Sequence, residues 1–199
     1  GGAGVDTITG QGGNDTITGG AGDDVFVLAA GEDTITDFVV GAAEDDIHLD
    51  LSEVEGESTM DLVMLDDWAS AAASDAPAVT TVTGAFDLGG TGVATANSMV
   101  LVLNGNITGT TTTALETAVG TALKSGGDFA MTVNGATEAN DGWLVLFDNG
   151  TNSYLATCET EAIIADNGNP ANLTVNVITV FTGIADCTTI TASLADIIA

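Results

Sequence analysis

The chain has almost no positive charge. Its 199 residues include a single Lys, Lys124, and no Arg, against 29 Asp and Glu, so the formal net charge is -28 at pH 7. Such a field repels polyanions, which argues against nucleic acid as a partner. The charge also opposes compaction through self-repulsion, so we expect the protein to work at high ionic strength or to bind cations, with divalent metals the natural candidates. Most of the acidic residues fall in the first third of the chain.

Cysteine, histidine and long apolar runs are also scarce. Nothing around Cys158 and Cys187 has the spacing of a zinc site, and a disulfide and two free thiols are both compatible with the sequence. One His, one Lys and the lack of hydrolase, zinc-protease or phosphate-loop motifs leave little acid–base chemistry, so we expect no enzyme activity. No apolar run approaches the roughly 18 to 20 residues that span a bilayer. We therefore expect no membrane span.

What the sequence does contain is a nine-residue repeat at its N-terminal end. Residues 1–27 read GGAGVDTITGQGGNDTITGGAGDDVFV, three near-copies of a glycine-rich turn that ends in Asp and is followed by a short strand. Glycine permits positive φ and a close approach of carbonyl oxygens, and Asp supplies the charged oxygen that a hard cation prefers. The strands are expected at residues 7–9, 16–18 and 25–27, each with one apolar side chain directed inward. The repeat therefore indicates calcium-loop chemistry.

Two other interpretations of the repeat are open to the sequence alone. Gly-Gly-Asp stretches also occur in flexible linkers and hairpin turns, although a strict nine-residue period argues against that. Outward threonine pairs such as Thr7 and Thr9 are typical of flat β-solenoids that bind ice or sugar surfaces. Val25 and Val27 interrupt this array, however, and ordinary β-propensity of solvent-facing threonine explains it equally well.

The repeat resembles the RTX nonapeptide, G-G-x-G-x-D-x-U-x, with one departure where Gln11 replaces the second Gly. A fourth, degenerate unit, LAAGEDTIT at residues 28–36, lacks the leading glycines, so its turn is expected to be a weaker half-site. The resemblance implies a parallel β-roll with two strands and two turns per coil, in which units i and i+2 share an ion and about two Ca²⁺ are bound. The residues it assigns to Ca²⁺ are Asp6 and Asp24 on one edge, Asp15 and Asp33 on the other, and the turn carbonyls at Gly1, Gly10 and Gly19.

The segment after the repeats resembles the end of an RTX roll. Residues 33–55, DTITDFVVGAAEDDIHLDLSEVE, contain D-x-I-x-D-F-x-x-G followed by D-x-I-x-L, so Asp37 and Phe38 are expected to begin a cap. Three further acids could feed another ion or form a solvated acidic face: Asp45, Asp46 and Asp50. Among them we assign Asp46 to a metal site.

The C-terminal half is expected to be β-rich with one helix. Runs separated by Gly, Asn and Asp predict strands, and Asn104–Gly105 and Asp148–Gly150 predict hairpin turns. Thr113 and Glu116 fit a capping box for a helix that ends at Lys124. Four aromatic side chains are expected in the core of the sheet: Trp143, Phe147, Tyr154 and Phe181.

The predicted fold class is mainly β, with three parts. A short parallel β-roll and its cap cover residues 1–51, a connecting segment covers 52–97 with a short helix near 68–74, and a sandwich-like β-rich domain with one helix covers 98–199. Because Gly1 is in phase with the repeat, we expect the chain to be the tail of a longer protein.

The C-terminal stretch, residues 141–199, resembles the terminal domain of secreted RTX and surface-layer-type proteins. The resemblance implies export by a type I exporter that reads an uncleaved C-terminal signal, with which the ending Ile197–Ala199 is compatible. We therefore expect a secreted, calcium-binding structural protein that self-associates at the cell surface as a surface layer, matrix or filament. The alternative is the C-terminal export and folding module of a secreted hydrolase, toxin or adhesin.

Overall fold

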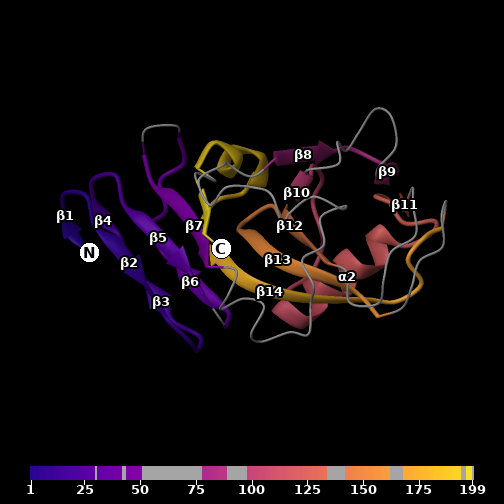
Figure 1. The fold of residues 1–199 in the computed structure, drawn as a ribbon, viewed down its shortest axis with the longest axis horizontal. Coiled ribbons are helices and arrows are strands. Elements are labelled where there is room, and N and C mark those ends of the chain that lie inside the picture. Colours follow the sequence, from indigo (N-terminus) through magenta and orange to yellow (C-terminus); the bar gives the residue numbers. More distant parts are fainter. Residues whose placement is uncertain are drawn as a thin grey trace.

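The computed structural model describes residues 1–29, 31–41, 44–50, 78–88, 98–133, 142–161, 168–193 and 196–198. Strands dominate these residues, with a coiled N-terminal part at one end of the molecule and a larger sheet region at the other (Figure 1). The predicted mainly-β class, a parallel β-roll together with a β-rich region, is confirmed. No helix among these residues has the length and apolarity to cross a membrane.

The repeats wind into a parallel β-roll because each short strand lies beside the strand one coil further on. Thr7 is the register partner of Val25, and Thr16 is the partner of Thr34, an offset of 18 residues. The strands of the roll are β1 (Gly2–Ala3), β2 (Thr7–Thr9), β3 (Thr16–Ile17), β4 (Gly20–Ala21), β5 (Val25–Leu28), β6 (Asp33–Ile35) and β7 (Asp46–Asp50). Two nine-residue units therefore complete each coil, as the sequence predicts.

The last coil is longer than the others. Val25 is the register partner of Asp46, and the matching hydrogen bond spans 21 residues instead of 18, which is three residues more. The N–H of Asp45 donates to the carbonyl of Val39 at 3.2 Å and closes the enlarged turn. The insertion therefore places Asp45, 21 residues after Asp24, beside Asp24.

A seven-stranded sheet joins the roll to the C-terminal half. Its order is β3-β6-β14-β13-β12-β10-β8, and β6 pairs in parallel with β14. The strands outside the roll are β8 (Ala78–Val82), β9 (Phe86–Leu88), β10 (Ser98–Leu103), β11 (Met131–Val133), β12 (Gly142–Asp148), β13 (Ser153–Thr160), β14 (Leu173–Phe181) and β15 (Asp196–Ile198). A second sheet, β15-β7-β5-β2, also brings a C-terminal strand onto the roll. The ranges 1–51 and 98–199, expected as separate domains, thus share two sheets.

The predicted connecting segment contributes strands of its own. Strand β8 pairs in parallel with β10 at one edge of the large sheet, and β9 pairs in parallel with β11. Within the range expected as a connecting segment, residues 78–88 therefore belong to the sheets. The short helix expected near 68–74 and the side chain of Asp50 lie outside the described residues.

One of the two predicted hairpin turns is wrong. Asp148–Gly150 does connect the antiparallel strands β12 and β13. Asn104–Gly105, in contrast, follows β10, whose neighbours β8 and β12 both run parallel to it. Parallel neighbours need a crossover connection, and the chain between β10 and β12 contains the helix α2 (Thr112–Leu123) and strand β11.

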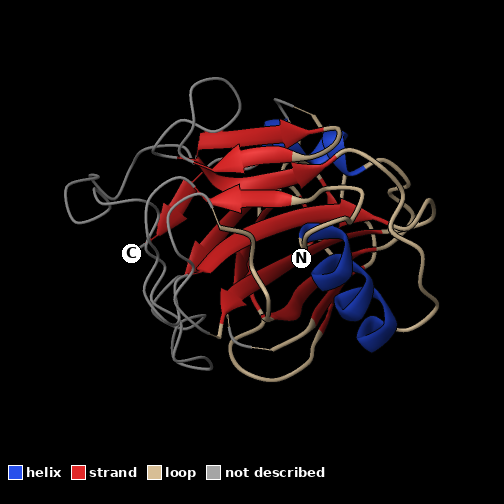
Figure 2. Cartoon of the chain, turned by 90° about the vertical axis from the view of Figure 1, so that its right-hand side faces the viewer, coloured by secondary structure: helices blue, strands red, loops and turns tan. Residues whose placement is uncertain are grey.

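Helix α2 packs against the large sheet (Figure 2). Its N-cap is Thr111, whose Oγ1 accepts a hydrogen bond from the N–H of Ala114 at 3.2 Å, so the predicted capping box at Thr113 and Glu116 is wrong. The Glu116 carboxylate instead accepts from the N–H of Val177 in β14 at 3.1 Å, beside the irregular register between β13 and β14. The predicted end of the helix is confirmed, because Lys124 is the C-cap.

One continuous hydrophobic core runs from the roll into the sheet. Phe38 links the two, since its ring centroid lies 5.6 Å from that of Phe26 in β5 and 5.1 Å from that of Phe181 in β14. The four predicted core aromatics are all buried: Trp143, Phe147, Tyr154 and Phe181. The roll and the sheet are consequently one packing unit.

Both cysteines are buried as free thiols, so the disulfide that the sequence left open is not formed. Burial, reinforced by the charge of Glu159, raises the pKa of Cys158 to about 12. Burial, followed by the charge of Asp148, also raises the pKa of Cys187. Both thiols are therefore protonated at neutral pH.

Candidate metal centre

The structure arranges the repeat aspartates in two rows, one on each edge of the roll. On the first edge the N–H of Asp6 donates to Asp24 Oδ1 at 2.9 Å, and the N–H of Asp24 donates to Asp45 Oδ1 at 2.9 Å. On the second edge the N–H of Asp15 donates to Asp33 Oδ1 at 3.0 Å. The structure thus brings Asp6 together with Asp24 and Asp15 together with Asp33, the pairs that the resemblance assigns to shared ions.

On the second edge the backbone hydrogen bond uses one oxygen of the Asp33 carboxylate and leaves the other. Oδ1 of Asp33 is held by the backbone, whereas Oδ2 of Asp33 is buried and has no hydrogen-bond partner. A buried carboxylate oxygen without a partner carries a large desolvation penalty. A bound hard cation, which takes oxygen ligands at about 2.3–2.6 Å, would offset this desolvation penalty.

Gly10 forms a cradle beside this oxygen. A Cβ atom built on Gly10 would lie 3.1 Å from Oδ2 of Asp15 and 3.1 Å from Oδ2 of Asp33. Oδ2 of Asp15 and Oδ2 of Asp33 therefore approach the same point beside Gly10, so the two carboxylates converge on one side of this turn. A side chain at position 10 would project into this space.

Gly1 and Gly19 have the same role on the first edge. A Cβ atom on Gly1 would collide with Oδ2 of Asp6 and with the carbonyl of Gly19, and one on Gly19 would meet Oδ2 of Asp24. The turns therefore need glycine where the carboxylates and carbonyls converge, which agrees with the assignment of these turn carbonyls as ligands. No three acidic, histidine or cysteine side chains cluster in the described part of the chain, so any ion here needs other oxygen ligands besides a carboxylate pair.

The electrostatics of the second edge favour a bound cation. Burial raises the pKa of Asp33, the charge of Asp15 raises it further, and the N–H of Asp15 opposes the shift. The chain's only Lys or Arg side chain, Lys124, sits at the C-cap of α2. No positive group of the described residues contributes to the shift at Asp33, so a cation from outside the polypeptide would compensate the charge of this pair.

The degenerate fourth turn keeps the geometry of the others. Gly31 has φ of +114°, close to the +110° of Gly13 one coil earlier, and a Cβ at Gly31 would collide with the carbonyl of Gly13. Leu28 and Ala29, which stand where leading glycines would be, are buried. Gln11 has φ of +66°, a conformation that no other non-glycine residue of the described chain adopts.

Asp45, and not the predicted Asp46, continues the row on the first edge. Asp45 is 2 % exposed, and its Oδ2 accepts from the N–H of Val39 at 2.8 Å while its Oδ1 accepts from Asp24. Asp46 lies one residue further on, at the start of β7. A sequence signal does identify Asp45, because each aspartate of the rows lies two residues before a strand residue that points inward, and Asp45 has this spacing to Ile47.

Asp37 closes the roll, as the sequence predicts for the start of a cap. Its Oδ1 accepts from the N–H of Gly19 at 2.8 Å, and its Oδ2 accepts from the N–H of Gly20 at 2.9 Å. Asp37 therefore satisfies two backbone donors that would otherwise require another glycine-rich turn.

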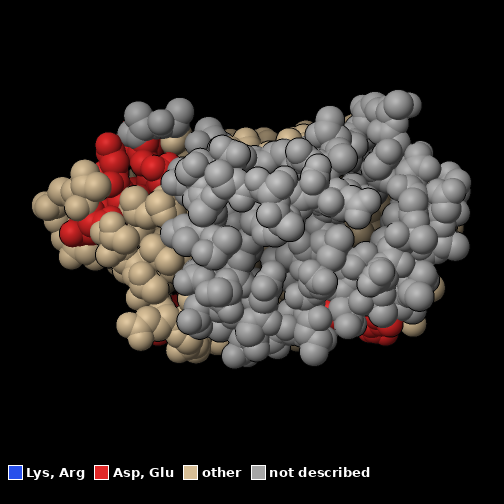
Figure 3. Space-filling model, viewed as in Figure 1, with Lys and Arg blue, Asp and Glu red and all other residues tan. Residues whose placement is uncertain are grey.

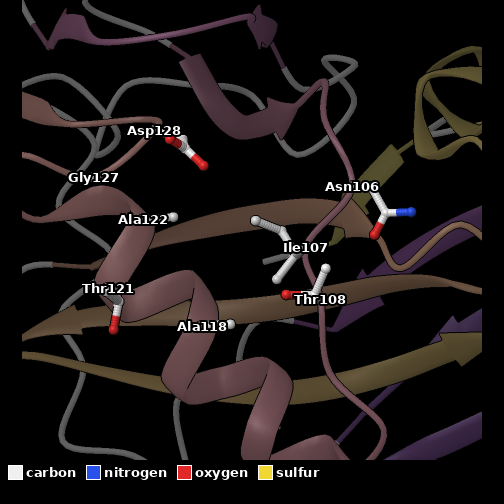
Figure 4. Close-up of a pocket in the computed structure, with 8 residues that line it drawn as sticks. All are labelled: Asn106, Ile107, Thr108, Ala118, Thr121, Ala122, Gly127 and Asp128. Carbon is white, nitrogen blue, oxygen red and sulfur yellow. The ribbon is translucent and has the colours of Figure 1, made fainter.

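A hollow of about 300 Å³ lies away from the roll, between α2 and the loop that follows β10 (Figure 4). Ile107 and Ala118 contribute apolar surface to it, and Asp128 is the one charged residue of its lining. We assign no chemistry to it.

The comparisons with known proteins agree with the geometry of the roll. Residues 1–35 match the family model of the RTX calcium-binding nonapeptide repeat, in four copies. No curated protein and no solved structure matches the chain. RTX repeats bind calcium ions and are typical of secreted proteins exported by the type I route. The N-terminal part of the chain is therefore an RTX repeat segment, and Ca²⁺ is the ion that its repeats bind.

Proposed function

We propose that this chain is a calcium-binding extracellular structural protein that folds and assembles at the cell surface after type I secretion. One observation carries the proposal: β6, which bears Asp33 of the second calcium edge, is also a strand of the large sheet, where it pairs with β14. The ion-binding edge is thus built into the main body of the protein. Calcium that orders the roll also orders the edge on which that sheet is completed.

The mechanism follows from the thermodynamic linkage between calcium binding and folding of the roll. Without the ion, the paired carboxylates repel each other and the glycine-rich turns gain conformational entropy, so the roll is disfavoured. Calcium that binds only the folded coil stabilises it by about 2.7 kcal/mol per site when its concentration is 100 times the dissociation constant. Low calcium inside the cell would keep the chain unfolded for export, and high calcium outside would fold it.

The surface of the protein favours assembly through strands and ions. Among the described residues only two large hydrophobic side chains are exposed, Val5 and Val39, so the described part of the surface offers no broad apolar patch. Strands β3 and β8 are the edges of the large sheet, and acidic side chains gather on the roll end in the face that Figure 3 shows. We propose that copies meet through unpaired strand edges and that divalent cations offset their mutual repulsion. The role is non-catalytic, with neither nucleic acid nor a membrane span involved.

Electron microscopy of the purified chain tests the proposal. Sheets or filaments should form with Ca²⁺ and be absent with a chelator or with Mg²⁺ alone at the same ionic strength. Asp24→Asn, which weakens the first edge, should raise the calcium concentration needed for assembly, whereas Asp23→Asn, at an exposed neighbouring position, should not. Dispersed particles under every condition would reject surface assembly and favour the export and folding module of a larger secreted protein.

A further inference from the structure

Two buried side-chain atoms in the described part of the chain lack a hydrogen-bond partner, and they belong to neighbouring residues. These atoms are Oδ2 of Asp33 in β6 and Oγ1 of Thr179 in β14, and both residues are fully buried. Asp33 and Thr179 are register partners across the parallel pairing of the two strands. Unpaired buried polar atoms are rare in folded proteins, so two of them at one register position call for a common explanation.

Both side chains lie on the same face of the sheet. Register partners in adjacent strands project to one side, and residues two positions apart along a strand share a face. Two positions further on, Ile35 and Phe181 are also register partners, and both are fully buried in the core. Asp33 and Thr179 therefore face inward, at the end of the row that begins with Asp15 (Figure 1, β6 and β14).

Strand β14 occupies the position where another coil of the roll would lie. A further coil would bring another aspartate beside Asp33, whereas β14 brings the hydroxyl of Thr179. A hydroxyl is a neutral hard donor that can ligate Ca²⁺ without adding to the charge of Asp15 and Asp33. We propose that Thr179 Oγ1 is a ligand of the calcium ion held on the Asp15–Asp33 edge, supplied by the C-terminal half of the chain.

The proposal accounts for both orphan atoms with one ion. A carboxylate oxygen buried beside a second carboxylate needs a positive partner, and no positive group among the described residues acts on Asp33. Thr179 Oγ1 has no hydrogen-bond partner in the protein because, in this proposal, it binds the ion. The first edge differs, since its row ends at Asp45, whose two oxygens are both bound by backbone N–H groups. Only the second edge thus has a ligand from outside the repeats.

A calcium ion held in this way links the roll to the sheet. Its affinity depends on the pairing of β6 with β14, and the pairing in turn depends on the ion. The inference rests on calcium binding by the repeats and is independent of surface assembly. Assembly can fail while the proposal holds, and the proposal can fail while the repeats still bind calcium.

The experiment is a calcium titration of the full chain with Thr179→Val, which removes the hydroxyl and keeps the shape of the side chain. We expect one of the sites to bind calcium about tenfold more weakly. Thr179→Ser, which keeps the hydroxyl, should remain close to the wild type. The matched control is Thr157→Val, in which a buried threonine of β13 with its own partner, the carbonyl of Asn176, is changed in the same sheet. Terbium luminescence lifetimes in H₂O and D₂O should show one additional water on the ion in T179V.

The free energy of unfolding, measured with and without calcium, distinguishes a hydroxyl that binds the ion from one that has only a structural role. In chelator, T179V should be as stable as the wild type or more stable, because it removes an unpaired hydroxyl; in calcium it should be less stable. A T179V titration that superimposes on the wild type, or an equal loss of stability in both conditions, would overturn the proposal. If T179V does not fold, Thr179→Ala takes its place: an additional water on the ion and weaker calcium binding support the ligand, and values equal to those of the wild type reject it.

Discussion

Thr112 donates a hydrogen bond from its Oγ1 to Oε1 of Glu32 at 2.8 Å, across 80 residues of sequence. Glu32 precedes Asp33 in the fourth turn of the roll, and Thr112 is the first residue of α2. The bond therefore ties the start of the helix to the turn that holds the second calcium edge. Together with the pairing of β6 and β14, it connects the roll to the C-terminal half.

Replacing Asp33 by Asn should have opposite effects with and without calcium. In chelator, Asp33→Asn removes a buried charge and should stabilise the fold by about 1–3 kcal/mol. In calcium it removes a ligand oxygen, so the affinity for one ion should fall. Urea unfolding under both conditions measures this. Asp23→Asn is the control, since Asp23 is exposed, and a loss of stability for D33N in chelator would contradict the account.

Asp45 and Asp46 should respond very differently to the same substitution. Asp45→Ala leaves the buried N–H of Asp24 and the partly buried N–H of Val39 without acceptors, so it should lose about 2–4 kcal/mol of unfolding free energy. Asp46→Ala removes a half-buried side chain at the start of β7 and should cost less than about 1 kcal/mol. Thermal and urea unfolding in calcium compare the two variants. An equal or larger effect at position 46 would show that the row ends at Asp46.

Gln11→Gly should stabilise the protein. Gln11 has φ of +66°, a conformation that costs a non-glycine residue about 1–2 kcal/mol. Glycine avoids this strain, but it loses more conformational entropy on folding, which offsets part of the gain. The net gain should be about 0.5–1 kcal/mol in calcium-saturated protein. Gln11→Ala, which keeps the strain, should change the unfolding free energy by less. A destabilised Q11G would mean that the Gln11 side chain makes a contribution that outweighs its backbone strain.

The two thiols should resist alkylation while the protein is folded. Cys158 and Cys187 are 0 % exposed, and burial raises the pKa of both, that of Cys158 to about 12. Neither thiolate nor access is available near pH 8, so iodoacetamide should label both only after denaturation, as intact-mass measurement would show. Rapid labelling of native protein at either cysteine contradicts the burial.

The same thiols predict how stability changes in alkali. The unfolded thiols ionise near the ordinary value of 9.0, whereas the folded thiols keep their protons. The unfolded state then binds fewer protons, so stability falls as pH rises from about 9 toward 12. Cys158→Ala should flatten this part of the stability profile, and an unchanged slope would show that the thiol does not contribute.

Local patterns in the sequence predicted the roll well. The nine-residue period fixes β2, β3 and β5, because each turn and strand is encoded by neighbouring residues. The sequence likewise predicted the turn at Asp148–Gly150 and the burial of Trp143 and Phe147. The helix end at Lys124 followed from the glycines after it, whereas its start did not, since four threonines in succession from position 110 can each act as a cap.

The pairing of strands that are distant in the sequence could not be predicted from the sequence. Nothing in the short strand β6 specifies β14 as a neighbour, and nothing in Asn104–Gly105 reveals that β10 has parallel partners on both sides. Asp46 was assigned in place of Asp45 because the three-residue insertion breaks the period at that point. Thr179 was missed altogether, since a lone threonine in a predicted strand acquires meaning only from its register with Asp33.

The central claim is that calcium orders the roll and, through β6, the sheet beside it. Hydrogen–deuterium exchange of the full chain, followed by mass spectrometry with calcium and then with chelator, tests it most directly. We predict protection of residues 1–50 in calcium and its loss on chelation, with a parallel loss at residues 173–181. Protection of the roll that is the same in chelator and in calcium would contradict the account.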